Sequence, residues 1–295
     1  MTPAVVTAPV VTAIVDRGEP VVTVGGALVV PWWSFTKTVL AAAALTLVRD
    51  GALDLDRKPE GAPYTLRQLL QHTAGLGDYG ELAEYHAAVA RRYDPWPVAE
   101  LLARNRADEL RYPPGESWRY SNIGYLKLGQ LIEGATGLPL DTALERAVLG
   151  PLGIGGAKLA RGRADLRCVA MGGVGGYHPG WVYHGLLVGP LHEAARLLDR
   201  LLGGSLLPPA LIGEMRSARL LGPAIRGRPH AAPGYGLGLM IDMAGSDGSV
   251  GHTGGGPGTT IAVYRRERFG APIVIAAFAD GDDPGVVEQA AFGIA

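Results

Sequence analysis

The feature that most constrains the fold is a change of signal along the chain: strand-type sequence lies at both ends and helix-type sequence fills the middle. Residues 4–15 and 20–30 are rich in Val and Thr and predict a β-hairpin. The last two strand-type segments of the chain are joined by a short link, so that part of the sheet should be antiparallel. We therefore expect an α/β (α+β) fold in which both ends of the chain form one antiparallel sheet flanked by helices. The later segments are strands at 234–243, 258–265 and 272–279 and a closing helix at 284–292.

The middle of the chain predicts an inserted, all-helical domain. Ala and Leu at helical spacing predict a helix at residues 34–50, which Gly51 ends. We assign residues 1–51 and 171–295 to the sheet domain and residues 52–170 to the helical domain. Further helices are expected at about 65–72, 80–92, 97–105, 121–136, 139–149, 190–203 and 208–218.

Composition narrows the class of protein. With 47% apolar and 19% charged residues in a chain of 295, a large core can be buried and there is no signature of disorder. A formal net charge of -1 without a basic stripe argues against nucleic-acid binding. The single cysteine, Cys168, excludes an internal disulfide, and we interpret it as an ordinary half-buried thiol.

The N-terminal residues and the hydropathy of the chain indicate the cellular compartment. No Lys or Arg precedes the first apolar stretch, which Pro3 and Pro9 interrupt, so this stretch makes a poor signal peptide. No uncharged run is apolar enough to cross a bilayer. We expect a cytoplasmic protein without a membrane partner; a signal removed earlier stays an alternative.

Three short motifs carry the candidate chemistry, and the first is Ser34-x-x-Lys37 at the start of the expected helix. Residues three apart share a helix face, so the two side chains should meet. A serine hydroxyl needs a base, and a lysine can serve where its surroundings favour the neutral amine, whereas arginine cannot. The chain has four lysines against 23 arginines, and one of the four is here. Taken alone, the motif more often marks a serine helix cap followed by a surface lysine.

The second motif is Tyr120-Ser121-Asn122, just before an expected helix. On an extended loop, Tyr120 and Asn122 point to one side. A phenol near an ammonium group loses its proton more easily and can relay it. Asn122 could bind a substrate amide or fix Lys37. The alternative is that Ser121 or Asn122 only caps the helix.

The third motif lies in the glycine-rich segment 251–258, which includes His252-Thr253-Gly254-Gly255. Gly254 and Gly255 would let a substrate lie against a strand. The N–H group of Gly255 is a candidate oxyanion donor beside that of Ser34. The alternative is a glycine-rich turn between two strands.

Taken together, the ordered motifs resemble the serine β-lactamase and penicillin-binding protein superfamily, whose patterns are S-x-x-K, S-D-N and K-T-G. The Tyr-Ser-Asn version is similar to the class C β-lactamase branch, which also holds D-alanyl-D-alanine carboxypeptidases, D-aminopeptidases, carboxylesterases and some acyltransferases. Residues 69–75, Leu-Leu-Gln-His-Thr-Ala-Gly, resemble that branch's Leu-Leu-x-His-Thr-Ser-Gly segment. We interpret this second His-Thr pair, His72-Thr73, as structural.

The resemblance implies a β-lactamase/transpeptidase-like fold and a role for each motif residue. Ser34 would be the nucleophile, and Lys37 and Tyr120 would share general base and acid duty. The substrate would be a small molecule, with no cofactor and no metal. The residues implied to contact that substrate are Asn122, His252, Thr253, Gly254 and Gly255.

Two departures from the family pattern bear on the substrate. His252 stands where the third motif usually begins with Lys, and Gly255 stands where carboxypeptidase-like members often carry Thr. A mostly neutral histidine attracts a carboxylate less than lysine does. We therefore expect hydrolysis of short activated esters and weak or absent turnover of cephalosporins.

The aromatic segment 177–184 could line an acyl pocket or pack as a connecting loop. His178, His184 and His192 do not have a zinc-site spacing, so we expect no metal. Trp32 and Trp33 are expected to pack beneath the nucleophile helix.

The leading hypothesis is a serine hydrolase that acts through an acyl-enzyme on an ester, an amide or a D-amino-acid peptide. An acyltransferase, a β-lactamase or carboxypeptidase, and a non-catalytic binding protein remain alternatives, and the oligomeric state is open. We expect Ser34 Oγ, Lys37 Nζ and Tyr120 Oη to converge in one cleft between sheet and helices, bordered by His252. The Ser34–Lys37 pair should lie roughly 2.6–3.2 Å apart.

Overall fold

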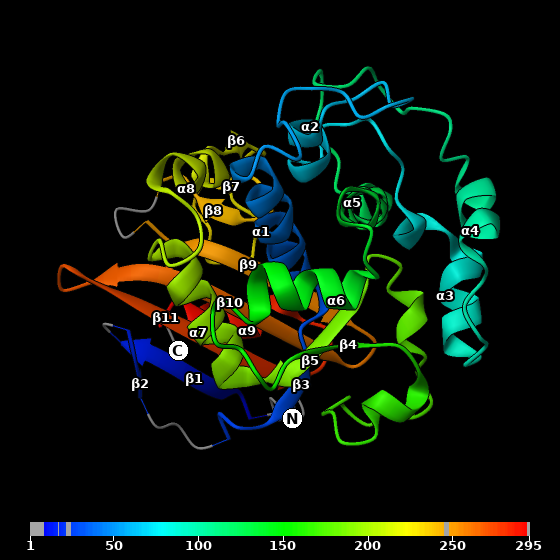
Figure 1. Ribbon diagram of the computed structural model, residues 1–295. Coiled ribbons are helices and arrows are strands. Elements are labelled where there is room, and N and C mark those ends of the chain that lie inside the picture. Colours follow the sequence, from blue (N-terminus) through cyan, green and yellow to red (C-terminus); the bar gives the residue numbers. More distant parts are fainter. Residues whose placement is uncertain (1–8, 17, 22–24, 245–247, 294–295) are drawn as a thin grey trace.

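The computed structural model describes residues 9–16, 18–21, 25–244 and 248–293, and a large antiparallel sheet forms its centre (Figure 1). Among these residues, eight strands follow the order β2-β1-β11-β10-β9-β8-β7-β6. Near the chain ends β1 pairs with β11, so that Ala13 lies opposite Ala276. The expected sheet built from both ends of the chain is confirmed. Its strands are β1 (Val11–Asp16), β2 (Glu19–Val21), β6 (Arg219–Leu220), β7 (Pro233–Tyr235), β8 (Met240–Asp242), β9 (Val250–Gly256), β10 (Thr259–Arg268) and β11 (Ala271–Asp280).

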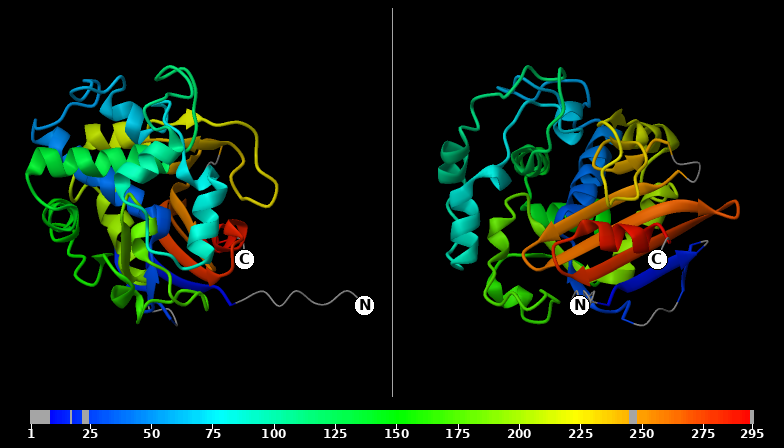
Figure 2. Two further views of the ribbon diagram at one scale, coloured as in Figure 1. Left: turned by 90° about the vertical axis from the view of Figure 1, so that its right-hand side faces the viewer. Right: turned by 180° about the vertical axis from the view of Figure 1, so that it is seen from behind.

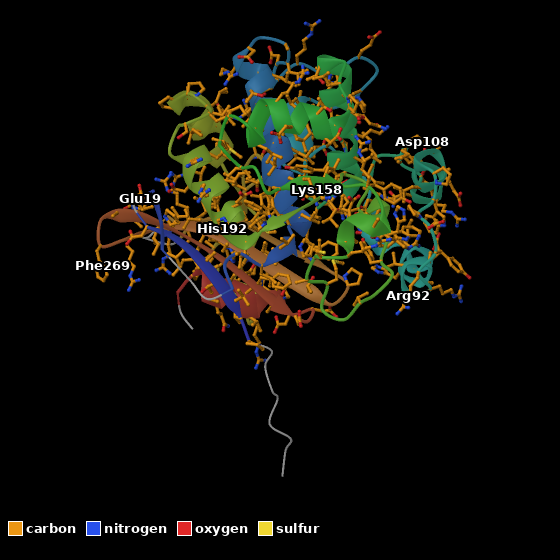
Figure 3. The ribbon with its side chains drawn as sticks, turned by 60° about the horizontal axis from the view of Figure 1, so that its bottom comes forward. Glu19, Arg92, Asp108, Lys158, His192 and Phe269 are labelled. Atoms are coloured by element: carbon orange, nitrogen blue, oxygen red, sulfur yellow. The ribbon has the colours of Figure 1, made fainter. Side chains whose placement is uncertain are left out.

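Alternating side chains give this sheet two different cores. Val263 and Val274 belong to the core shared with α1 (Thr36–Arg49) and α7 (Leu191–Leu202). Tyr264 and Ile275 belong to a smaller core that α9 (Pro284–Ala291) covers, and Figure 2 shows α9 over β10 and β11 in the view from behind. The hairpin between β10 and β11 ends in Phe269, whose side chain is 92% exposed (Figure 3).

Helix α1 lies in the middle of the molecule. All its residues from Thr36 to Thr46 are buried, including a run of four alanines at 41–44. A helix that is buried all round belongs to a core and not to a surface. The helix expected at 34–50 is therefore present, and Lys37 lies on its buried first turn.

A second, three-stranded sheet departs from the expected N-terminal hairpin. β3 (Val29–Pro31) does not continue the large sheet but pairs with β5 (Leu186–Pro190), which also pairs with β4 (Lys158–Ala160). The hairpin expected from residues 4–15 and 20–30 is thus limited to β1 and β2, and residues 4–8, 17 and 22–24 lie outside the described part. Val-rich sequence predicts a strand but does not identify its partner, which explains the error.

The helices expected between residues 52 and 150 are present on one side of the large sheet (Figure 1). A π-helical turn, Glu145–Leu149, extends α6. Because β4 lies within residues 52–170, that stretch is not purely helical, and the domain boundaries stay a prediction. The helices of this region are α2 (Leu66–Leu70), α3 (Ala83–Ala90), α4 (Val98–Asn105), α5 (Asn122–Thr136) and α6 (Leu140–Leu144), and α8 (Pro209–Arg216) follows α7.

The length and apolar character of each helix show whether it could span a membrane. Within the described ranges, none is both long enough and apolar enough to cross a membrane.

Candidate active site

Ser34 lies in a one-turn 3-10 helix, Trp33–Phe35, that runs directly into α1. Both preceding tryptophans are buried, as expected, and fix the turn: Trp32 donates to Gly189 O at 3.3 Å and Trp33 donates to Thr259 Oγ1 at 2.9 Å. Trp33 has a φ of 39°, a backbone conformation that costs free energy in a bulky residue and is held here by its surroundings. The turn leaves Ser34 partly exposed at the end of a buried helix.

The amine of Lys37 contacts three polar side chains, one of which is Ser34. Its Nζ lies 3.1 Å from Ser34 Oγ, 2.7 Å from Asn122 Oδ1 and 3.1 Å from His184 Nε2. Lys37 is 0% exposed, and none of these three partners carries a negative charge. The expected meeting of Ser34 and Lys37 is therefore present in the structure, within the expected range of distances.

The surroundings of Lys37 favour its neutral form. Burial lowers the pKa of Lys37 to about 7, and the charge of Asp78 opposes this shift only in part. A lysine with a pKa near neutrality can accept a proton from a serine hydroxyl. The geometry and the pKa together make Lys37 the candidate general base.

Tyr120 joins the same cluster, but its ionisation differs from the sequence expectation. Lys37 Nζ lies 4.9 Å from the centre of the Tyr120 ring. Burial raises the pKa of Tyr120 well above its usual value, and a hydrogen bond with Ser34 opposes that rise only in part. The expectation that a nearby ammonium group would ease loss of the phenol proton is therefore wrong, because burial has the larger effect. Tyr120 stays protonated at neutral pH and can act as a proton donor.

His72, interpreted from sequence as structural, holds the Tyr120 loop in place. Its Nδ1 accepts from the Ser121 N–H at 3.1 Å, and its carbonyl accepts from the Arg119 N–H at 3.1 Å. Its ring packs against that of Tyr120, with 4.3 Å between the ring centres. Burial lowers the pKa of His72 well below its usual value, so the ring is a neutral support.

Asp78 is a site residue that the sequence analysis missed. Asn122 Nδ2 donates to both oxygens of Asp78, at 3.0 and 3.3 Å, and this orients Asn122 Oδ1 toward Lys37. Asn122 thus fixes Lys37, one of the two roles considered for it. The only local sign of Asp78 is its cap on the short turn Tyr79–Glu81, through the Gly80 N–H.

The glycines of β9 have different surroundings. A Cβ added to Gly254 would lie 2.6 Å from Ser34 N, and one added to Gly256 would lie 2.4 Å from the Trp33 ring. These two positions therefore need glycine because the nucleophile turn packs against them. Gly255, in contrast, is exposed, and a Cβ there would make only ordinary contacts.

His252 and Thr253 are turned away from Ser34 by their hydrogen bonds. The Nδ1–H of His252 donates to Thr253 O at 2.7 Å, so Nε2 accepts from the Tyr235 hydroxyl at 2.9 Å. Burial lowers the pKa of His252 to about 3, and the ring is neutral. The Thr253 hydroxyl contacts Tyr264 and Glu288, on the face that α9 covers. Contact of either side chain with a substrate stays a prediction that this geometry does not favour.

A cavity of about 410 Å³ opens above Ser34. The aromatic segment 177–184 contributes to its wall, as one of the two interpretations of that segment expects. His252 does not contribute, so the expectation that it borders the cleft is not met. The lining residues include Ser34, Asn122, His184 and Gly255 together with the rings of Trp33, Tyr79, Tyr85 and Tyr177.

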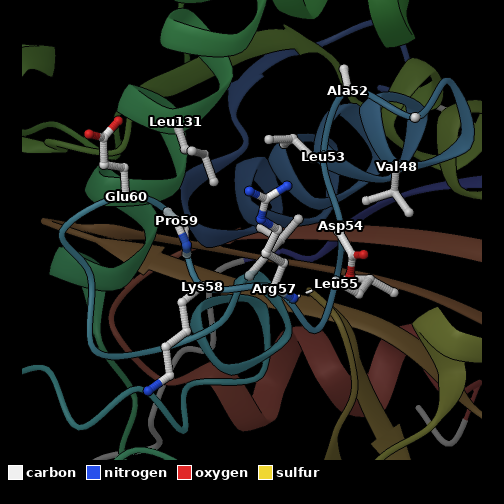
Figure 4. A pocket seen from close by; sticks show the side chains of 12 residues that line it. Val48, Ala52, Leu53, Asp54, Leu55, Arg57, Lys58, Pro59, Glu60 and Leu131 are labelled. Atoms are coloured by element: carbon white, nitrogen blue, oxygen red, sulfur yellow. Dashed lines mark hydrogen bonds between the residues drawn. The ribbon is translucent and has the colours of Figure 1, made fainter.

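A larger cavity, about 930 Å³, lies elsewhere, between the end of α1, residues 51–60 and Leu131 of α5 (Figure 4). Charged side chains such as Asp54, Arg57 and Lys58 line it, and no candidate catalytic residue does. Volume alone therefore does not identify the site of chemistry.

Comparisons with known proteins identify the family of the chain. The family model described as Beta-lactamase matches residues 6–294. The chain is 34% identical over 144 residues to Esterase EstB of Burkholderia gladioli, covering 41% of this chain and 36% of that esterase. It is 34% identical over 104 residues to a D-aminopeptidase of Cereibacter sphaeroides, covering 34% of this chain and 19% of that enzyme. The matches thus span about a third of the length of the esterase and about a fifth of that of the D-aminopeptidase.

Solved structures give a more complete match. A D-stereospecific amidohydrolase from Streptomyces sp. superposes with a TM-score of 0.79 at 26% identity, covering 98% of this chain and 95% of that one. A D-amino acid amidase from Ochrobactrum anthropi, at 22% identity and a TM-score of 0.72, covers 92% and 87% and supports the fold alone. With a family model that spans nearly its whole length, the chain belongs to the beta-lactamase family, in the class C-like branch of esterases, D-aminopeptidases and D-amidases.

Proposed function

We propose that this member of the family is a serine hydrolase that forms an acyl-enzyme on Ser34 with an ester or a D-amino-acid amide. The observation that carries the proposal is the buried amine of Lys37, with a pKa lowered to about 7 and an Nζ 3.1 Å from Ser34 Oγ. A serine beside a neutral, desolvated amine is an activated nucleophile. A surface lysine serving a structural role would not need this burial.

In the acylation step, the Ser34 Oγ proton passes to Lys37 Nζ as Oγ attacks the substrate carbonyl carbon. When the tetrahedral intermediate collapses, the bond to the leaving alcohol or amine breaks, and Tyr120 donates a proton to that group. The Lys37 ammonium then returns a proton to Tyr120, which restores both residues. In the second half, water attacks the acyl-serine and Lys37 takes its proton. The intermediate then collapses, the bond between Ser34 Oγ and the acyl carbon breaks, and the Lys37 ammonium returns the proton to Ser34 Oγ as the acid leaves.

The developing oxyanion needs preorganised donors. The N–H groups of Ser34 and Gly255 are the candidates, because the backbone of β9 passes directly beside the nucleophile turn. Among the described residues, β8 pairs with β9 only at Val250 and Gly251, so no strand covers that edge of β9 near Gly255. An extended substrate could therefore lie along it.

The cavity supports an apolar, aromatic acyl group. Four aromatic rings line it, and its volume of about 410 Å³ suits a side chain of phenylalanine size plus a leaving group. The names of the relatives, an esterase, a D-aminopeptidase and a D-stereospecific amidohydrolase, fit the same substrate range.

Recognition of a carboxylate is poorly supported at this site. His252 is neutral, and both of its ring nitrogens have partners within the protein. Since β-lactams and D-alanyl-D-alanine peptides carry a free carboxylate, we propose that this enzyme prefers uncharged esters and amides.

The test is mass spectrometry of the protein after reaction with a fluorophosphonate, a 4-nitrophenyl ester, D- and L-phenylalanine amide, and a cephalosporin. We expect an adduct on Ser34 with the fluorophosphonate, turnover of the ester, faster turnover of the D-amide than of the L-amide, and little reaction with the cephalosporin. Absence of any Ser34 adduct would support the binding-protein alternative. A larger yield of ester product when an alcohol acceptor is added would support the acyltransferase.

A further inference from the structure

His184 lies in direct contact with the candidate base but has no part in the family motifs. It stands in the loop just before β5, it is 3% exposed, and its Nε2 lies 3.1 Å from Lys37 Nζ. It also lines the cavity above Ser34. The two residues are 147 positions apart in sequence, so this contact is made only by the fold.

The hydrogen-bond capacity of Lys37 explains what His184 can do. A neutral amine has two N–H donors and one lone pair. Asn122 Oδ1 can take one N–H, because Asp78 fixes the orientation of the Asn122 amide. If His184 Nε2 takes the other, the lone pair is left for Ser34, the third neighbour of Nζ. Acceptance of the Ser34 proton requires this arrangement.

The tautomer of His184 decides whether its Nε2 accepts a hydrogen bond from Lys37 or donates one to it. With its proton on Nδ1, the ring accepts from Lys37 through Nε2. With its proton on Nε2, the ring would donate to the lone pair of Lys37 and compete with Ser34. His184 Nδ1 is buried without a hydrogen-bond partner among the described residues, so no protein group selects the tautomer from that side.

We propose that His184 is a positioning residue: in its Nδ1–H tautomer it accepts one N–H of Lys37 and so directs the amine lone pair toward Ser34. The inference rests on the proposed function, because it describes how the base of that reaction is oriented.

The electrostatic surroundings of Lys37 agree with a neutral His184. Burial and the charge of Lys37 lower the pKa of His184 well below its usual value. Asp78 raises the pKa of Lys37, whereas the loss of an acceptor at position 184 would lower it, because the ammonium form gains most from an acceptor. The titratable side chains that surround Lys37 are Asp78, Tyr120, Tyr125, His72, His184 and His252.

The first experiment compares His184→Phe with His184→Gln by the pH profile of acylation. Phe fills the space without an acceptor, so we expect the rate to fall about 10- to 100-fold and the acid limb to move to lower pH. Gln has an acceptor oxygen, so it should restore most of the rate and return the acid limb toward that of the wild type. The matched control is His192→Phe on α7, whose ring contacts Gly26 O and not the site.

Two outcomes would overturn the inference. A Phe variant with wild-type rate and acid limb would show that the contact has no effect. Equal losses in the Phe and Gln variants, with an unchanged acid limb, would show that His184 only fills space.

A second measurement determines the tautomer of His184 directly in the wild-type protein. The ¹⁵N NMR spectrum of the wild type, with His184 assigned through His184→Gln, should show a neutral ring protonated on Nδ1, and protonation on Nε2 would contradict the proposal. A wild type that forms no acyl-enzyme would refute the proposed function instead. The two failures are therefore distinguishable.

Discussion

Lys37 and Glu288 are both fully buried charged residues, on helices that cover opposite faces of the large sheet, but their surroundings differ. Glu288 on α9 forms an ion pair with Arg228 and accepts a hydrogen bond from Thr253. Lys37 on α1 contacts only neutral groups, and the carboxylate of Asp78 reaches it through Asn122.

This difference separates a structural charge from a reactive one. A buried carboxylate that is paired with an arginine can hold elements together. Lys37, without a counter-ion in contact, has a pKa lowered to about 7 by burial and can change its protonation near neutral pH. The contacts of Glu288 with Arg228 and Thr253 fasten β9 to α9, whereas the role proposed for Lys37 requires it to exchange a proton beside β9. The predictions below test that separation.

The largest effect is expected from Lys37→Arg. Arginine keeps the positive charge but cannot accept a proton, so the rate of Ser34 acylation should fall by about 10²- to 10⁴-fold while the circular dichroism spectrum is unchanged. The rate of fluorophosphonate labelling measures this. Lys158→Arg, at an exposed lysine labelled in Figure 3, is the matched control. Near wild-type labelling would make Lys37 an electrostatic anchor and not a base.

The next effect concerns stability instead of activity. Glu288→Gln removes the counter-ion of Arg228, and the free energy of unfolding should fall by about 3 kcal/mol, measured by urea denaturation. Glu100→Gln, which breaks an exposed pair with Arg104, should cost less than about 1 kcal/mol. Acylation by the Glu288 variant should change by only a few-fold. A large loss of acylation without a loss of stability would mean that the two charges do not have separate roles.

The third prediction is a dependence on pH that arises from Lys37. Only the neutral amine is a base, so with a pKa of about 7 the value of kcat/KM should fall about tenfold per unit as pH drops below 7 and should level off above it. A profile without an acid limb near pH 7 would contradict the assignment.

The same pKa affects stability. Because the pKa of Lys37 in the folded protein is below the usual lysine value of 10.5, the unfolded chain binds more protons between about pH 7 and 10.5, and stability should rise with pH across that window. The contribution of Lys37 should be absent from Lys37→Met, which can be checked by thermal unfolding across the same pH range.

The smallest effect is expected from Asp78→Asn. Asp78 raises the pKa of Lys37, so its neutralisation should move the acid limb to lower pH, by less than about one unit, and increase the relative rate at pH 6 by less than about tenfold. The readout is the midpoint of the acid limb and not the maximal rate. A shift to higher pH would contradict the role of Asp78 in raising the pKa of Lys37.

Local spacing was enough to predict part of the site. Ser34 and Lys37 are one helical turn apart, and the strand-type sequence at both ends of the chain predicted the antiparallel sheet. Asp78 and His184 were missed as site residues because Asp78 contacts Asn122 across 44 residues and His184 contacts Lys37 across 147, and no local pattern encodes such contacts.

Two expectations from sequence were wrong for the same reason: the ionisation of Tyr120 and the pairing of β3. The pKa of Tyr120 depends on how deeply its ring is buried, which a neighbouring charge in the motif does not reveal. The partner of β3 depends on which strand edge is available after folding. Motif order identified residue types, and burial and pairing were decided by the tertiary structure.

The pairing of β1 with β11 also has a consequence for biosynthesis. Thr12 leaves the ribosome 265 residues before its partner Ala277. At about 5–20 residues per second, the first strand waits roughly 13–53 s for the neighbour that completes its backbone hydrogen bonds. During that interval Ala13 and Val15 lack the β11 side chains beside which they pack, and the unpaired backbone of β1 is open to pairing with other chains. The nascent protein can close this part of its sheet only after β11 has been synthesised.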